Sequence, residues 1–127
     1  MKSLVKSKKI LIVEDNPHMS TLLSDILEIF DFQTIRANDG EEALVFLKSE
    51  DFDMVITDLK MPKIGGMELL NSIKATQPQL PVVVITAYEK PSTQDEIFKA
   101  KADGFLAKPF TVKDIEGLLK RVLDYSK

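Results

Sequence analysis

Hydrophobic residues gather into five short runs along the chain, and each run ends at a polar or turn-forming residue. Short runs rich in β-branched residues are typical of strands buried on both faces of a sheet. The predicted strands are 9–13, 33–37, 54–58, 82–85 and 105–107. The second run alternates with polar residues, which favours a peripheral strand, and the fourth is the most apolar, which favours a central one.

Apolar residues between these runs recur at helical spacing, and capping signals begin most of the segments. Asn16 can cap a helix that starts at Pro17, and Asp39 with Glu42 forms a capping box. A further helix is predicted after the third strand and stops before Pro78. Another begins at a capping box of Thr93 and Glu96 and runs to about Ala102. The last helix begins after its cap Thr111, with Asp114 at the third position. The residues expected on buried faces of the first, third and last helices are Met19, Leu22, Leu23, Ile26, Leu27, Phe30, Leu69, Leu70, Ile73, Ile115, Leu118, Leu119, Val122 and Leu123.

Strands and helices alternate along the chain and are joined by short turns. This alternation predicts right-handed crossovers and a parallel sheet with helices on both faces. The expected fold class is α/β, a flavodoxin-like doubly wound three-layer sandwich with five helices and a five-stranded parallel sheet in the order 2-1-3-4-5. In that order the first and third strands are neighbours, so the residues that follow them meet at one edge.

Composition limits the classes of function. The 127 residues suffice for one domain, with 44% hydrophobic and 29% charged residues as in an ordinary globular protein. No cysteine is present, which excludes disulfides, thiolate metal sites and thiol nucleophiles. The net charge of −3 gives no basic stripe, so nucleic acid is not an expected direct partner. The apolar run at 10–13 is too short for a signal peptide or membrane span, so we expect a cytoplasmic protein.

Three carboxylates are expected to converge at the carboxyl edge of the sheet. Asp58 ends the third strand, and Glu14 and Asp15 directly follow the first. Two unit charges about 4 Å apart repel by about 4 kcal/mol at an effective dielectric of about 20, so such a site needs positive charge. Lys108, after the fifth strand, offers one charge, and a divalent cation offers two. Oxygen ligands without histidine or cysteine suit Mg²⁺.

The same edge suits phosphoryl transfer. An aspartate can accept a phosphoryl group covalently, and this transfer depends on positioning and charge neutralisation more than on acid–base chemistry. The hydroxyl of Thr86, at the end of the fourth strand, can bond a phosphoryl oxygen. Asp58 alone could be a turn residue before Met61 and Pro62, but its companions at the edge favour the chemical interpretation.

Four segments in order resemble the receiver domain of two-component response regulators. They are ILIVEDN at 10–16, VITDLKMP at 55–62, VVVITAY at 82–88 and ADGFLAKPF at 102–110. No single segment is decisive, whereas all four at this spacing are specific. The resemblance implies one receiver domain over residues 1–127, with its core at about 8–124, that acts as a phosphorylation-activated signalling switch.

The resemblance also implies a role for each residue at the edge. Asp58 would be the phosphoacceptor, and Lys108 would pair with the phosphorylated aspartate. Glu14, Asp15 and Asp58 would bind Mg²⁺, with the backbone carbonyl of Lys60 as a further ligand. The Lys108–Pro109 peptide bond is expected to be cis.

Phosphorylation would be read out by two switch residues. Thr86 would move toward the phosphoryl group and Phe105 would turn inward behind it. This movement would alter the surface formed by the fourth helix, the fifth strand and the last helix. The implied partners are a histidine kinase or histidine phosphotransfer protein, a downstream protein target on that surface, and a second copy of the chain in a phosphorylation-dependent homodimer. Acetyl phosphate is an expected small donor.

The sequence departs from the family pattern, or varies within it, at three positions. Gly65 stands where the family often has an aspartate. Lys60 and Tyr88 lie two residues beyond the acceptor and the switch threonine, where the family tunes dephosphorylation. Their bulk and charge predict a slower loss of the phosphoryl group than in chemotaxis regulators.

Two other functions stay open at this point. A magnesium-dependent phosphatase would form an aspartyl phosphate, but such enzymes commonly place an acid two residues after the nucleophile, where this chain has Lys60. A docking module independent of phosphorylation is disfavoured by the complete set of acids, threonine and lysine. We therefore expect no enzyme beyond a phosphoacceptor that catalyses its own phosphorylation and slow dephosphorylation. His18 has no histidine or cysteine partners, so we expect an exposed first-turn residue.

Overall fold

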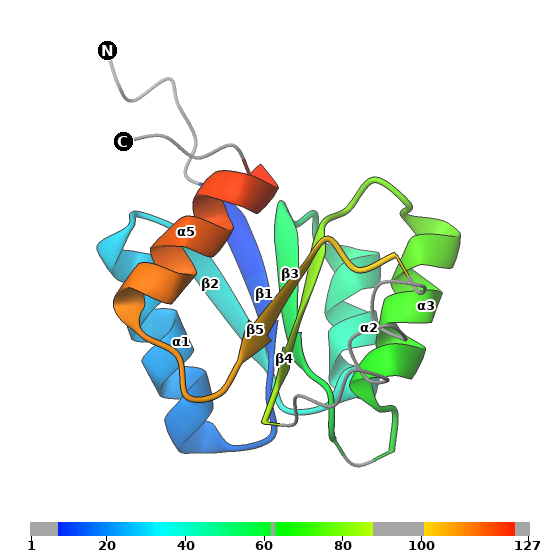
Figure 1. Cartoon of the computed structure of the whole chain (residues 1–127). Coiled ribbons are helices and arrows are strands. Elements are labelled where there is room, and N and C mark those ends of the chain that lie inside the picture. Colours follow the sequence, from blue (N-terminus) through cyan, green and yellow to red (C-terminus); the bar gives the residue numbers. More distant parts are fainter. Residues whose placement is uncertain (1–7, 62, 88–100, 124–127) are drawn as a thin grey trace.

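The computed structural model describes residues 8–61, 63–87 and 101–123, and a parallel sheet forms its centre (Figure 1). The strands are β1 Lys9–Val13, β2 Gln33–Ala37, β3 Met54–Asp58, β4 Val82–Thr86 and β5 Gly104–Ala107. They form one 5-stranded sheet in the order β2-β1-β3-β4-β5, and every neighbouring pair is parallel. The predicted α/β sandwich and its strand order are confirmed.

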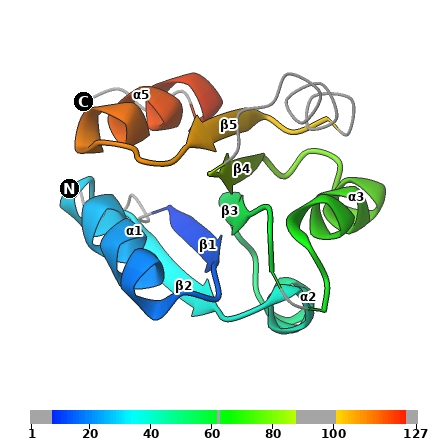
Figure 2. The same cartoon turned by 60° about the horizontal axis from the view of Figure 1, so that its bottom comes forward.

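Helices cover both faces of the sheet, as Figures 1 and 2 show. The helices of the described ranges are α1 Pro17–Ile29, α2 Gly40–Ser49, α3 Gly66–Thr76 and α5 Val112–Leu123. The helices α1 and α5 lie on one face, and α2 and α3 lie on the other (Figure 2). None of these helices is long and apolar enough to cross a membrane.

The helix predicted from Thr93 to about Ala102 falls mainly outside the described residues. Its last two positions are described, and neither Lys101 nor Ala102 is helical. Lys101 has a φ of 69°, a left-handed conformation that is not α-helical. No helix therefore includes Lys101 or Ala102, and the rest of this helix stays a prediction.

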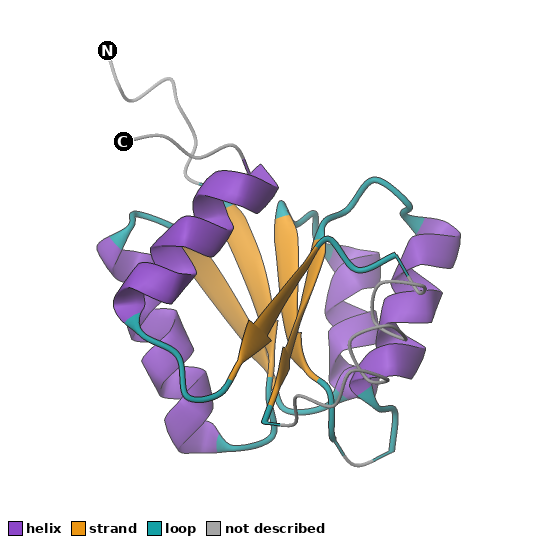
Figure 3. Ribbon diagram, in the orientation of Figure 1, coloured by secondary structure: helices purple, strands orange, loops and turns teal. Residues whose placement is uncertain are grey.

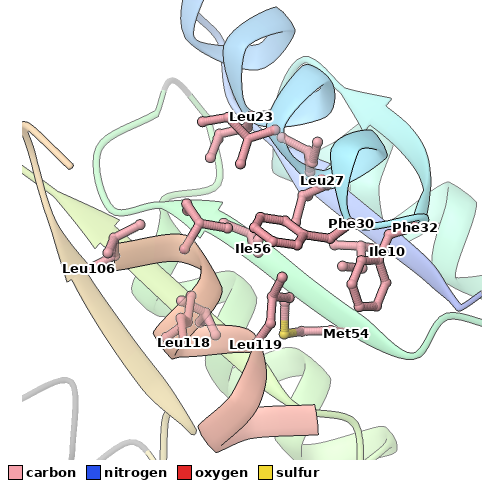
Figure 4. Close-up of a cluster of buried hydrophobic side chains, with 14 of the residues drawn as sticks. Ile10, Leu23, Leu27, Phe30, Phe32, Met54, Ile56, Leu106, Leu118 and Leu119 are labelled. Atoms are coloured by element: carbon pink, nitrogen blue, oxygen red, sulfur yellow. The ribbon is translucent and has the colours of Figure 1, made fainter. Parts of the chain in front are cut away.

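Two hydrophobic clusters fill the spaces between the sheet and its helices. Side chains alternate across β1, so Ile10 and Ile12 enter one cluster and Leu11 and Val13 enter the other. Figure 4 shows the cluster beneath α1 and α5, where Phe30 and Leu27 lie over Ile10 and Ile56 of the sheet. Each fully buried Leu or Ile contributes about 1.5–3 kcal/mol, and this burial explains why the strands are apolar on both faces.

Two predicted capping boxes form at helix starts, and in one of them the returning hydrogen bond goes to the residue before the cap. At α5, the Asp114 N–H donates to Thr111 Oγ1 at 3.1 Å, and the Thr111 N–H donates to Asp114 Oδ2 at 2.8 Å. At α2, the Glu42 N–H donates to Asp39 Oδ1 at 2.8 Å. The Glu42 carboxylate accepts the N–H of Asn38 at 2.6 Å, which is one residue before the cap.

Leu22 was expected on the buried face of α1, and this expectation is wrong because its side chain is 45% exposed. The apolar stripe of α1 is wider than the surface that the sheet and α5 can cover. Leu23, Ile26 and Leu27 occupy the covered part, and Leu22 lies at its edge.

All five strands point the same way, so their carboxyl ends share one edge of the sheet, at the bottom of Figure 3. The loops that follow β1, β3 and β5 lie along this edge (Figure 3). Ligands of open α/β sheets bind at such an edge where the strand order reverses. Here the reversal lies between β1 and β3, which is where the candidate site forms.

Candidate functional site at the carboxyl edge of the sheet

The sheet backbone fixes the two inner acids of the site. Asp58 is the last residue of β3 and pairs in register with Ile85 of β4, and its side chain is 12% exposed. Glu14 directly follows β1, and its N–H donates to the Ala37 carbonyl at 3.1 Å, which extends the ladder to β2 by one bond. Both carboxylates therefore arise from rigid backbone rather than from free loops.

Glu14, Asp15 and Asp58 direct carboxylate oxygens toward a common space. One oxygen of each residue lies within 4.8 Å of the others. The Glu14 side chain is 2% exposed, whereas Asp15 is open to solvent. The site thus has a buried floor and an open mouth, which suits a cation that keeps several of its waters.

Lys108 brings a positive charge from β5 to these acids. Its Nζ donates to Asp58 Oδ2 at 3.3 Å and lies 3.6 Å from Glu14 Oε1. The Lys108 N–H donates to the Thr86 carbonyl at 2.9 Å, so the ladder between β4 and β5 continues into this residue. The Lys108–Pro109 peptide bond is cis, as the resemblance implied.

One ammonium does not compensate the buried charge. The pKa of Glu14 is raised from 4.5 to about 7, first by burial and also by the negative charge of Asp58, while the Asn16 N–H and Lys108 oppose the rise. Glu14 Oε2 accepts the Asn16 N–H at 3.1 Å. Glu14 Oε1 is buried without a hydrogen-bond partner among the described residues.

These residues fit a divalent cation on the evidence of their own geometry. A buried carboxylate oxygen without a hydrogen bond is costly, and a cation beside it would reduce that cost. The donor set is oxygen only, with two buried carboxylates and one solvent-facing carboxylate. Such a set suits Mg²⁺ better than the transition metals that favour nitrogen and sulfur.

The two expected switch residues lie on β4 and β5, on the opposite side of β3 from β1. Thr86 is the last residue of β4, is 1% exposed and pairs in register with Ala107. Phe105 is half-buried and packs against the hydrophobic cluster on the α2 and α3 face of the sheet. Thr86 thus lies on the strand next to that of Asp58, and Phe105 lies one strand further from it.

The remaining predicted positions are those of Lys60, Tyr88 and His18. Lys60 is exposed in the loop after β3, and Tyr88 lies outside the described residues. His18 is exposed in the first turn of α1, as expected, and its N–H donates to the Asn16 cap at 2.9 Å.

Sequence reasoning missed two residues that shape the site. Asn16 was assigned only as a helix cap, yet its N–H also supports the Glu14 carboxylate. Gly66 was not singled out as a site residue, yet a Cβ there would overlap the Asp58 carbonyl oxygen and Leu59 Cα. A glycine shortly after a strand-ending acid is the signal that could have revealed this close approach.

The response regulator receiver domain family matches residues 10–120, so the chain belongs to this family. Receiver domains bind Mg²⁺ at an acidic site and interact with histidine kinases and downstream targets. The chain is accordingly a CheY-like, phosphorylation-activated signalling switch of a two-component system and not a conventional enzyme.

Some curated relatives match over nearly their whole length. Chemotaxis protein CheY-3 of Vibrio cholerae is 38% identical over 124 residues, which covers 95% of each chain. Chemotaxis protein CheY of Pseudomonas aeruginosa is 34% identical, over 91% of this chain and 96% of that protein. The alkaline phosphatase synthesis transcriptional regulatory protein PhoP of Bacillus subtilis is 31% identical, and the chain spans 50% of its length.

Solved structures share the fold. Chemotaxis protein CheY4 of Vibrio cholerae matches with a TM-score of 0.87 at 28% identity, over 92% of this chain and 99% of that one. The response regulator TrrA of Thermotoga maritima, solved in complex with Mg(2+)-BeF, matches with a TM-score of 0.81 at 31% identity, over 89% and 96%. A receiver domain of a histidine kinase from Syntrophus aciditrophicus matches with a TM-score of 0.86 at 32% identity, over 93% and 91%.

Proposed function

We propose that Asp58 is the residue that accepts the phosphoryl group in this switch. The observation that carries the proposal is the contact of one lysine with two acids: Lys108 Nζ lies 3.3 Å from Asp58 Oδ2 and 3.6 Å from Glu14 Oε1. Asp58 is also the last residue of β3, so its carboxylate lies at the edge of the sheet where the strand order reverses.

In the proposed step, a carboxylate oxygen of Asp58 forms a bond to the phosphorus of a phosphohistidine. The phosphorus–nitrogen bond breaks, and its electron pair stays on the imidazole of the donor. The chain's own residues hold the nucleophile in place and neutralise charge. Lys108 can move its ion pair from the Asp58 carboxylate to the phosphoryl oxygens as the acyl phosphate forms. No general base is needed because Asp58 reacts as the carboxylate.

Glu14, Asp15 and Asp58 would hold Mg²⁺, together with the backbone carbonyl of Lys60. Glu14 Oε1, which is buried without a hydrogen bond, and the raised pKa of Glu14 support this assignment. When bound, the ion supplies positive charge that draws the anionic donor to the acids. The chain would thereby catalyse its own phosphorylation, without turning over an external substrate as an enzyme does.

The proposed readout runs through Thr86 and Phe105. The Thr86 hydroxyl would bond a phosphoryl oxygen, and Phe105 would move further into the cluster against which it already packs. These changes bias two packings of one fold, so that phosphorylation shifts their populations. The downstream target would bind the surface of β5, α5 and the segment predicted as the fourth helix.

The switch would act with protein partners in the cytoplasm. A histidine kinase or histidine phosphotransfer protein would donate the phosphoryl group in the cytoplasm, and a phosphorylation-dependent homodimer is a further partner. Residues 1–127 would form a single receiver domain. Lys60 and Tyr88 would slow hydrolysis of the aspartyl phosphate by flanking the approach of water.

Labelling with acetyl phosphate tests the acceptor assignment. Wild-type protein should incorporate phosphoryl groups in a Mg²⁺-dependent manner, and Asp58→Asn should not, because an amide is a poor nucleophile. Asp25→Asn, an exposed position of α1, is the matched control and should label like wild type. Persistent Mg²⁺-dependent labelling of Asp58→Asn at an unchanged level would refute the assignment.

A further inference from the structure

The loop between β3 and α3 is closed by its own backbone. The Leu59 carbonyl accepts the Gly66 N–H at 2.9 Å, which joins the two ends of the loop. Helix α3 begins directly against the backbone of the acid, since a Cβ at Gly66 would overlap the Asp58 carbonyl oxygen. Lys60, whose carbonyl is the proposed fourth ligand, lies within this closed loop.

The first turn of α2 packs against the same loop from the side. Gly40 is the first residue of α2 and is buried. An ideal Cβ at this position would lie 2.7 Å from Ile64 Cβ and 2.8 Å from the Ile64 carbonyl oxygen, so only glycine permits the observed approach. Ile64 in turn packs against the cluster on the α2 and α3 face. Ile64 thus lies between the first turn of α2 and the core.

An ion pair joins the same two segments. Lys63 Nζ lies 3.1 Å from Glu41 Oε1 and 4.0 Å from Asp39 Oδ2. The backbone of Lys63 is left-handed, with a φ of 66°, at the point where the loop turns toward α2. Exposed ion pairs add little net stability. The Lys63 pair therefore constrains the loop less than the close packing of Gly40 against Ile64 does.

We propose that the first turn of α2, residues 39–41, is a positioning element for the metal site. It would hold the β3–α3 loop through Ile64 and Lys63, and so keep the Lys60 carbonyl where it can ligate the cation. The inference rests on the proposed Mg²⁺ site. Mg²⁺ demands near-ideal octahedral geometry, whereas Ca²⁺ accepts irregular shells. A displaced loop therefore costs Mg²⁺ affinity more than Ca²⁺ affinity.

Gly40→Ala tests the packing contact, because the added methyl must displace Ile64. Affinities of the full chain for Mg²⁺ and for Ca²⁺ are measured by isothermal titration calorimetry, together with the melting temperature. We expect about a tenfold or larger loss of Mg²⁺ affinity, as for other groups that orient metal ligands. The loss of Ca²⁺ affinity should be clearly smaller.

Gly117→Ala is the matched control for this variant. Gly117 lies in α5, and an added Cβ would meet only an Arg121 side-chain nitrogen at 3.5 Å. It should bind both cations like wild type. A folded Gly40→Ala protein with wild-type Mg²⁺ affinity would overturn the packing part of the proposal.

Lys63→Gln tests the ion pair at an exposed position, where misfolding is not expected. A nearby positive charge repels Mg²⁺, so removal of Lys63 should raise Mg²⁺ affinity if the lysine acts through charge alone. If Lys63 positions the loop, the affinity should fall, and Lys63→Arg should restore it because Glu41 remains paired. A rise in Mg²⁺ affinity in Lys63→Gln would overturn the role of Lys63 regardless of the Gly40 result.

Wild-type protein separates a failure of this inference from a failure of the proposed function. If wild type binds no Mg²⁺ and is not labelled by acetyl phosphate, the metal site itself is wrong. If wild type binds Mg²⁺ and both Gly40→Ala and Lys63→Gln bind it equally well, only the positioning role of α2 is wrong.

Discussion

Replacement of Glu14 with glutamine should make the metal-free protein more stable at pH 8. The buried carboxylate of wild type has one oxygen without a hydrogen bond and a pKa raised to about 7. The glutamine amide keeps the volume of the side chain and can still accept the Asn16 N–H. It carries no charge, so it avoids the desolvation that raises the pKa of Glu14.

The magnitude follows from the pKa of Glu14. A rise from 4.5 to about 7 corresponds to about 3 kcal/mol, because each pKa unit is worth about 1.4 kcal/mol. Between these two values the folded state binds more protons than the unfolded state, so the free energy of unfolding falls as pH rises. Wild type should therefore lose up to about 3 kcal/mol between pH 4.5 and pH 8 through this group. The variant should not.

Urea denaturation followed by circular dichroism, in the presence of a chelator, measures the difference. At pH 8 the variant should exceed wild type by about 2–3 kcal/mol, whereas at about pH 4.5, where Glu14 is mostly protonated, the two should be nearly equal. Glu116→Gln, which removes an exposed carboxylate of α5 that pairs with Lys120 at 4.0 Å, should change stability little at either pH. A Glu14→Gln protein that is less stable than wild type at pH 8 would show that Lys108 compensates the charge fully, against this reasoning.

Three further predictions concern other parts of the molecule. Mg²⁺ affinity should fall by up to about tenfold per pH unit below about pH 7, because protons compete with the cation for Glu14. Calorimetry at pH 8 and pH 6 measures this change, and an affinity that does not depend on pH would exclude Glu14 as a ligand. Replacement of Lys60 and Tyr88 with alanine should shorten the lifetime of the phosphorylated protein, measured by decay of the label; an unchanged lifetime would contradict their role. Lys74→Met should lower the free energy of unfolding by about 1–3 kcal/mol, because the Lys74 ammonium donates to Asp103 Oδ2 at 2.7 Å and to two backbone carbonyls. Urea denaturation measures this loss, and an unchanged free energy would show that these three hydrogen bonds are not stabilising.

The sequence predicted the sheet well because its strands are buried on both faces. In a strand such as β3, burial leaves little choice but β-branched and aliphatic residues, and the run ends where the chain reaches the edge at Asp58. The strand order then brings Glu14 and Asp58 together, and Lys108 with them. The composition of the site could be predicted because it depends on which strand each residue follows.

Features that depend on distances between segments could not be predicted in this way. The exposure of Leu22 depends on how much of α1 its neighbours cover, which periodicity does not report. The close approach of Gly40 to Ile64 joins the start of α2 to a loop distant in sequence. The raised pKa of Glu14 arises from the depth of burial, which differs greatly from that of the adjacent Asp15 although both are acids after one strand.

The most direct test of the central claim is chemical mapping of the phosphoryl group in wild-type protein. After incubation with acetyl phosphate and Mg²⁺, borohydride reduction and peptide mass spectrometry identify the residue that carried the acyl phosphate. The account predicts modification at Asp58, dependent on Mg²⁺ and absent when a chelator is present. Modification at another residue, or equal labelling of Asp58 in the presence of the chelator, would contradict it.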